Sequence, residues 1–158
     1  MKASTVNELK QELLNMTEPQ LVELCLRLAR FKKENKELLT YLLFEAHDEA
    51  SYIQSVKKEM DEQFANINQS SLYLAKKSIR KILRIANKYI RYSSSKTVEA
   101  ELLIHFCVAL NESKIPYHKS TALVNLYNAQ VKKIGVAVAS LHEDLQYDYL
   151  KELKKLSE

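Results

Sequence analysis

The chain has 158 residues, a formal net charge of +4, 46% hydrophobic residues and 28% charged residues, values that suit a globular protein and exclude a largely disordered one. One glycine and two prolines exclude a fold with many tight turns, which depend on these residues. We therefore predict an all-α protein, a single domain over residues 1–158 with about seven or eight helices. Short polar links between amphipathic helices predict either an antiparallel multi-helix bundle or a short helical-repeat array.

Capping residues predict where the first two helices begin. Thr5 with Glu8, and Thr17 with Gln20, have the spacing of a capping box, and Pro19 falls in the first turn, where its missing N–H is tolerated. The second helix has an apolar stripe at i, i+3, i+4 and i+7 spacing, and we expect this stripe to face the core. It consists of Leu21, Leu24, Cys25, Leu28 and Phe31.

Two later segments are apolar on nearly all sides. After a polar link at residues 32–36, in which Asn35 can cap the next helix, residues 37–46 form the first of them, and residues 97–111 form the second. Because a helix that is hydrophobic all round is normally buried, we expect both in the centre of the domain. Residues 37–42 and 101–106 also share a short similarity of the kind seen between helical repeats, although such leucine-rich matches often arise by chance.

The remaining elements follow from the same patterns. We predict a fourth helix to about residue 67, a long fifth helix from Ser70 or Ser71 to about Tyr92, a loop at residues 111–119, and helices over residues 120–139 and 143–156. Gly135 lies inside one of these helices, and we expect another helix backbone to approach closely there.

The two cysteines, the lengths of the apolar runs and the N-terminal residues predict the redox environment and cellular location. Cys25 and Cys107 both lie in apolar helical runs without the spacing of a disulfide framework or a zinc site, so we expect two buried thiols in a reducing compartment. The apolar runs are much shorter than the ~20 residues of a membrane span, and the N-terminus lacks a signal-peptide pattern. We therefore expect a cytoplasmic protein that does not enter the membrane.

The fifth helix carries the most distinctive feature, a basic face. Its cations fall within an arc of about 140° at 100° per residue, and no Asp or Glu occurs from residue 63 to residue 98. Tyr73 lies among these cations and Tyr92 near the end of the helix, where both could stack on a ligand. The candidate polyanion-binding residues are Lys76, Lys77, Arg80, Lys81, Arg84, Lys88 and Arg91.

Two interpretations of the basic face stay open. In the first, the face binds a polyanion, either an acidic protein or a nucleic acid. In the second, it is neutralised internally by the acid-rich fourth helix, which carries Asp48, Glu49, Glu59, Asp61 and Glu62. The sequence slightly favours internal neutralisation, because an antiparallel neighbour could bring these acids beside the bases.

Four residues are candidate metal ligands: Glu45 and His47 in one acidic cluster, and Glu101 and His105 one helical turn apart. Di-metal sites of ferritin-like bundles use two Glu-x-x-His motifs, and zinc proteases use His-Glu-x-x-His, and neither pattern occurs here. No phosphate-binding glycine loop or activated nucleophile is evident either. A metal-dependent enzyme is therefore the third hypothesis, and we predict no cofactor.

The sequence as a whole favours a non-enzymatic protein–protein interaction module with a basic helix face. A nucleic-acid-binding protein that uses the same face is the alternative. The sequence does not identify the protein or other polyanion that would be the partner, and it is compatible with a homo-oligomer.

Overall fold

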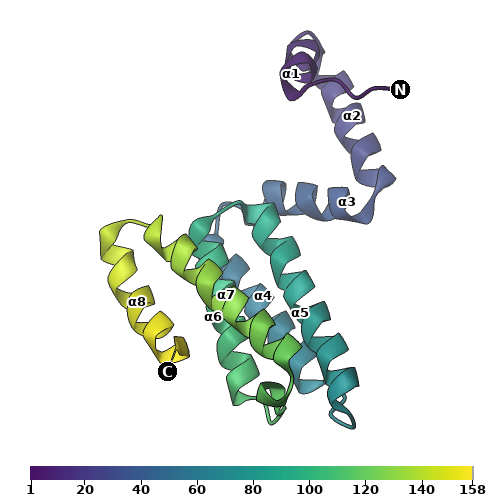
Figure 1. The fold of residues 1–158 in the computed structure, drawn as a ribbon. Coiled ribbons are helices and arrows are strands. Elements are labelled where there is room, and N and C mark those ends of the chain that lie inside the picture. The colour runs from purple at the N-terminus through teal and green to yellow at the C-terminus, as the bar shows by residue number, and fades with distance from the viewer. Residues whose placement is uncertain (158) are drawn as a thin grey trace. The chain divides into compact units, whose positions relative to one another are not determined.

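The computed structural model describes residues 1–157, and within them the protein is entirely helical, with no strand. The predicted all-α class and helix number are confirmed. The eight α-helices, one π-helical turn (η1) and one 3-10 turn (η2) are labelled in Figure 1 where space allows. Their bounds are α1 Val6–Leu14, α2 Glu18–Phe31, α3 Lys33–Thr40, η1 Tyr41–Glu45, α4 Glu49–Ala65, α5 Leu72–Ser93, α6 Lys96–Glu112, η2 Tyr117–Lys119, α7 Thr121–Ala139 and α8 Glu143–Ser157.

The chain divides into two compact units, which we call unit 1 (Met1–Phe44) and unit 2 (Glu45–Glu158). Unit 1 contains α1, α2 and α3, and unit 2 contains α4 to α8. Whether both behave as the single domain predicted over residues 1–158 stays a prediction. None of the described helices is long and apolar enough to cross a membrane.

The helix starts of unit 1 agree with the sequence. The Thr5 backbone N–H donates to Glu8 Oε2 (2.7 Å) while the Glu8 backbone N–H donates to Thr5 Oγ1 (3.3 Å), which completes a capping box. A second box joins Thr17 and Gln20, and Pro19 lies in the first turn of α2 as expected. Local sequence therefore determines where α1 and α2 begin.

The link between α2 and α3 differs from the prediction. It consists of Lys32 alone, in an extended conformation, and α3 begins already at Lys33. Asn35 caps no helix. Its side-chain Nδ2 donates instead to the Leu28 backbone oxygen (2.8 Å), and this bond joins α3 to α2, against which it packs.

The expectation that residues 37–46 form a buried central helix is wrong. The segment is divided between α3 and η1, and of its residues only Tyr41 is buried. Leu42, Leu43 and Phe44 are 56%, 62% and 67% exposed. Apolar residues on every side of a helix predict burial only where neighbouring elements surround that helix, and α2 covers at most one side of α3.

Unit 2 is built around α6, as its nearly wholly apolar sequence predicted. Four helices, α4, α5, α7 and α8, pack against it. Its large apolar residues are inaccessible to solvent, and the Phe106 ring lies 5.7 Å from that of Phe64 in α4. The buried residues of α6 are Val98, Ala100, Leu102, Leu103, Phe106, Cys107 and Leu110.

Two expectations about single residues need correction. Gly135 does not mark the close approach of a helix backbone, because a Cβ atom there would meet only the Leu153 side chain of α8, at an ordinary contact distance of 3.7 Å. Cys107 is buried as expected, but Cys25 is exposed, because its helix has no core to face.

Candidate functional site

The basic face of α5 is formed because the opposite side of this helix is buried. Ala75, Ile79, Ile82 and Ala86 pack into unit 2, against α4 and α6. This packing directs the cations outward, so that Lys77, Arg80, Lys81, Arg84 and Arg91 are exposed while Lys76 and Lys88 are half-buried.

Six of the seven predicted cations have no acidic partner. Among residues 1–157, none of these six forms an ion pair: Lys76, Lys77, Arg80, Lys81, Arg84 and Arg91. The seventh differs, since the Lys88 ammonium lies over the rings of Tyr89 (4.8 Å) and Tyr92 (5.9 Å). The unpaired six, which we call the basic face from here on, repel one another at i+3 and i+4 spacing by a few tenths of a kcal/mol for each pair.

Three of the five acids that the sequence offered as internal partners make other contacts. Asp48 caps α4 by accepting from the Ser51 backbone N–H (3.0 Å). Glu59 accepts a hydrogen bond from the Tyr89 hydroxyl (2.8 Å), and Asp61 contacts His105 of α6 (2.6 Å). Within the described chain, α4 thus places acids beside Tyr89 and His105 but forms no ion pair with the basic face.

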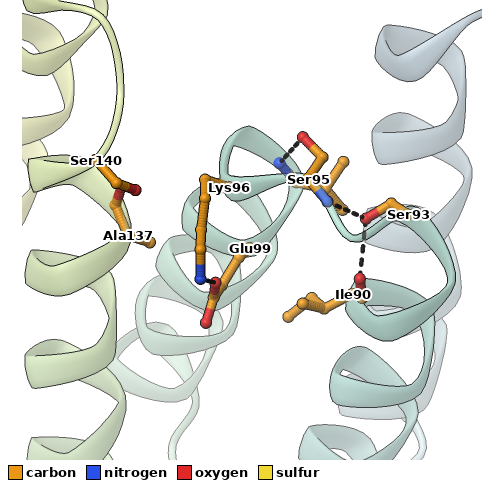
Figure 2. Close-up of polar contacts among 8 residues, drawn as sticks. Ile90, Ser93, Ser95, Lys96, Glu99, Ala137 and Ser140 are labelled. Carbon is orange, nitrogen blue, oxygen red and sulfur yellow. Dashed lines mark hydrogen bonds and ion pairs between the residues drawn. The ribbon is translucent and has the colours of Figure 1, made fainter.

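The C-terminal end of α5 sets a sharp limit to the basic face (Figure 2). Ser93 Oγ donates to the Ile90 backbone oxygen (3.0 Å) and accepts from the Ser95 backbone N–H (3.2 Å). Ser94 adopts the left-handed conformation (φ 53°) that ends the helix. The next cation after this turn is Lys96, whose ammonium forms an ion pair with Glu99 (2.6 Å). Lys96 is therefore not part of the basic face.

The two tyrosines predicted to stack on a ligand lie in different environments. Tyr73, near the start of α5, is 76% exposed and shares the side of the basic face at 100° per residue. Tyr92 is buried, so the expectation that it contacts a ligand is wrong.

The positive surface is only one helix wide. Counted from the sequence, α4 has four acids and two bases, and α6 has three acids and one base, so both neighbours of α5 are net negative. The unpaired cations of α5 thus form a narrow row, and the two helices packed against α5 carry an excess of acidic residues.

The candidate metal ligands do not form a metal-binding group. Of the residues described, no set of three or more His, Cys, Asp or Glu side chains lies close enough to hold a metal ion. Glu45 and His47 are exposed near the start of unit 2, whereas Glu101 and His105 are half-buried on α6. Glu101 accepts hydrogen bonds from Lys57 and Tyr149 (2.7 Å), and His105 contacts Asp61.

Glu101 has a structural role in this network. Burial alone would raise the pKa of its carboxyl group, but hydrogen bonds from Lys57 and Tyr149, together with the charge of Lys57, outweigh burial and lower this pKa. The ionised carboxylate therefore joins α4, α6 and α8 inside unit 2.

Neither cysteine has the surroundings of an activated nucleophile. Burial raises the pKa of the Cys107 thiol to about 12, which removes its thiolate at neutral pH. Cys25 is exposed in the middle of α2, away from the helix N-terminus, where a thiolate would be stabilised.

One further surface was missed by sequence reasoning. Two hollows on unit 1 lie between α2 and α3. The first is lined mostly by Leu and Ala side chains, including Leu28 and Leu42, whereas the second combines apolar residues such as Leu26 with four basic side chains. Leu28 belongs to the stripe of α2 that was predicted to face the core, and this expectation is wrong, because no residue of α2 is buried. No sequence signal distinguishes a stripe that faces a core from one that faces a partner.

Comparisons of this chain with models of known protein families, with curated proteins and with solved structures return no match. The function must therefore be argued from the geometry of the chain itself.

Proposed function

We propose that this protein is a non-enzymatic interaction protein, and that the basic face of α5 binds an acidic protein partner. One observation carries the proposal: six cations lie on one side of one helix without an acidic partner among residues 1–157. Self-repulsion along that side is relieved when a partner supplies the missing negative charge.

The shape of the charge distribution favours an acidic protein over a nucleic acid. Cations at positions 77, 80, 81 and 84 repeat at i+3, i+4 and i+7, the spacing at which acidic side chains recur on one side of another helix. A duplex that received α5 in its major groove, about 12 Å wide, would bring phosphates of both groove walls toward α4 and α6. Since both neighbours are net negative, such a complex is disfavoured.

Fluorescence anisotropy with three labelled probes tests the proposal. The first probe is a helical peptide whose glutamates recur at i, i+3, i+4 and i+7, the second has the same composition in scrambled order, and the third is a DNA duplex of matched charge. We expect the patterned peptide to bind most tightly and its affinity to fall as salt is raised. Tightest binding of DNA would replace the proposal by the nucleic-acid alternative, and no binding at low salt would overturn both.

Paired charge reversals locate the binding surface. Arg80→Glu with Arg84→Glu should weaken peptide binding at least about tenfold, since two contacts become repulsive. The variant should keep its fold, because both side chains are exposed and the new acids face Lys77, Lys81 and Lys88 at attractive spacings. The matched control is Lys132→Glu with Lys133→Glu on α7, two exposed residues whose reversal also lowers the net charge from +4 to 0. Equal loss in both variants would mean that net charge alone, and not the basic face, governs binding.

A further inference from the structure

Unit 1 exposes far more apolar surface than a folded segment normally tolerates. Among residues 1–157, twelve of the eighteen exposed large apolar side chains lie in unit 1, which has 44 of the residues. None of the residues in α1, α2 or α3 is buried. So many exposed apolar side chains on one small unit indicate an interface with another molecule.

The first element of that surface is α1, a short amphipathic helix without a partner. Its Val6, Leu9 and Leu13 lie on one side at i, i+3 and i+7, and Val6 and Leu9 are 84% and 52% exposed. An isolated helix shorter than about 12 residues is marginal in water, so nine residues need packing to stay helical. The polar side of α1 carries Glu8 and Glu12.

The second element is a groove between α2 and α3 that fits such a helix. Its floor is apolar, with Leu26, Leu39 and Phe44, and its rim is basic, with Arg30, Lys32 and Lys36. A helix with an apolar side and acidic flanks matches both the floor and the rim. Because Val6 and Leu9 are exposed, α1 does not occupy the groove of its own chain.

Acidic and basic residues are also separated along the sequence of unit 1. Residues 1–23 have four acids and two bases, whereas residues 24–40 have five bases and two acids. The acidic α1 and the basic groove are at opposite ends of α2, whose 14 residues span about 21 Å. Two antiparallel copies related by a twofold axis therefore place each acidic end against a basic end, and both contacts form at once.

We propose that two copies of this chain associate through unit 1, with α1 of each copy seated in the groove between α2 and α3 of the other. Stable dimers bury about 800 Å² for each partner, from about 20–30 residues, and unit 1 is large enough to supply them. This dimer does not depend on the basic face of α5, so either proposal can fail without the other.

Charge-swapped variants of the full chain test the pairing directly. In the first variant, Glu8→Gln and Glu12→Lys make α1 basic, and Gln at position 8 retains the capping box. In the second, Arg30→Glu and Lys36→Glu make the groove rim acidic. Each variant alone pairs like charges, whereas a heterodimer of the two pairs opposite charges at both contacts.

Light scattering after size exclusion measures the outcome. We expect the unaltered chain to elute with twice its mass of 18.3 kDa, each variant alone to dimerise at least about tenfold more weakly, and an equimolar mixture to recover the dimer. Lys132→Glu with Lys133→Glu on α7 should remain dimeric. Far-ultraviolet circular dichroism of each variant, compared with the unaltered chain, separates lost association from lost folding.

Three results would overturn the proposal. The first is an unaltered chain that stays monomeric at about 100 μM, well above the Kd expected of a dimer of this size. The second is undiminished dimerisation of both variants. The third is failure of the folded variants to associate in the mixture.

Discussion

Two segments of nearly the same apolar composition have opposite environments in this protein. Residues 38–44 lie in unit 1, where Leu42, Leu43 and Phe44 are exposed, whereas Leu103 and Phe106 of α6 in unit 2 are completely buried. The number of neighbouring helices explains the difference. Within their own unit α3 packs against α2 alone, while α6 packs against four helices. Apolar composition therefore predicts a tendency to be buried, and the surrounding elements decide whether burial occurs.

The same difference separates the two units as wholes. Both have well-capped helices: Thr5 starts α1 in unit 1, and Ser71 and Ser95 start α5 and α6 in unit 2. Only unit 2 has a core formed by several helices. Since most helical stability in proteins comes from tertiary packing, local capping alone gives the helices of unit 1 less stability than those of unit 2.

Thiol reactivity should give the largest difference between the units. Cys25 in unit 1 is exposed, while Cys107 in unit 2 is buried and its pKa is raised to about 12. At protein concentrations low enough to keep the chain monomeric, we expect the Cys25 thiol to react with an aromatic disulfide reagent at nearly the rate of an unfolded chain. The other should be protected at least about 10³-fold, because its exposure requires opening of the core. Absorbance at neutral pH measures both rates.

Single Cys→Ser variants assign the two phases. Cys25→Ser should remove the rapid phase and Cys107→Ser the protected one. If Cys25 of the monomeric chain were protected as strongly as Cys107, α2 would not be exposed, and the contrast between unit 1 and unit 2 would be wrong.

A matched pair of phenylalanine substitutions tests whether the buried and exposed apolar side chains of the two units contribute differently to the free energy of unfolding. Phe106→Ala should lower the free energy of unfolding of unit 2 by about 3–5 kcal/mol, because the side chain is completely buried and its loss leaves a cavity. Phe44→Ala should change the free energy of unfolding of the monomeric chain by less than about 0.5 kcal/mol, because the side chain is 67% exposed when no second copy covers it. Urea unfolding followed by circular dichroism measures both, and comparable losses in the two variants would contradict the assignment of Phe44 to a surface.

Much of the local structure could be predicted from the sequence, because its signals act over a few residues. The capping boxes at Thr5 and Thr17 and the cap at Ser71 mark helix starts through direct hydrogen bonds to nearby backbone N–H groups. The side of α5 that is buried was equally clear from its period.

The environment of each apolar stripe could not be predicted, because it depends on residues far away in the chain. Cys25 and Cys107 lie in similar apolar contexts, yet only Cys107 has other helices packed over it. The contacts of the α4 acids could not be predicted for the same reason. Whether Glu59 contacts a cation or Tyr89 depends on the rotation of α4 against α5, which the sequence pattern does not specify.

The smallest expected effect concerns the ion pair between Glu101 and Lys57 inside unit 2. Because the Glu101 pKa is lower in the folded protein than its ordinary value of 4.5, the folded state binds fewer protons than the unfolded chain. Its contribution to stability is therefore complete above pH 4.5 and is lost as the pH falls through the folded pKa. At neutral pH, Glu101→Gln should lower the free energy of unfolding by about 1–3 kcal/mol, since Lys57 and Tyr149 lose their carboxylate acceptor.

Urea unfolding at several pH values distinguishes this role from simple packing. The gap between the unaltered chain and Glu101→Gln should narrow steadily as the pH is lowered below 4.5, because protonation removes the charge that the variant lacks. Glu112→Gln, an exposed residue at the end of the same helix, should follow the unaltered chain at every pH within a few tenths of a kcal/mol. A gap that stays constant down to about pH 3 would mean that Glu101 contributes through its shape alone, since at that pH most carboxylates are protonated in the unfolded chain. The lowered pKa of Glu101 would then not stabilise unit 2.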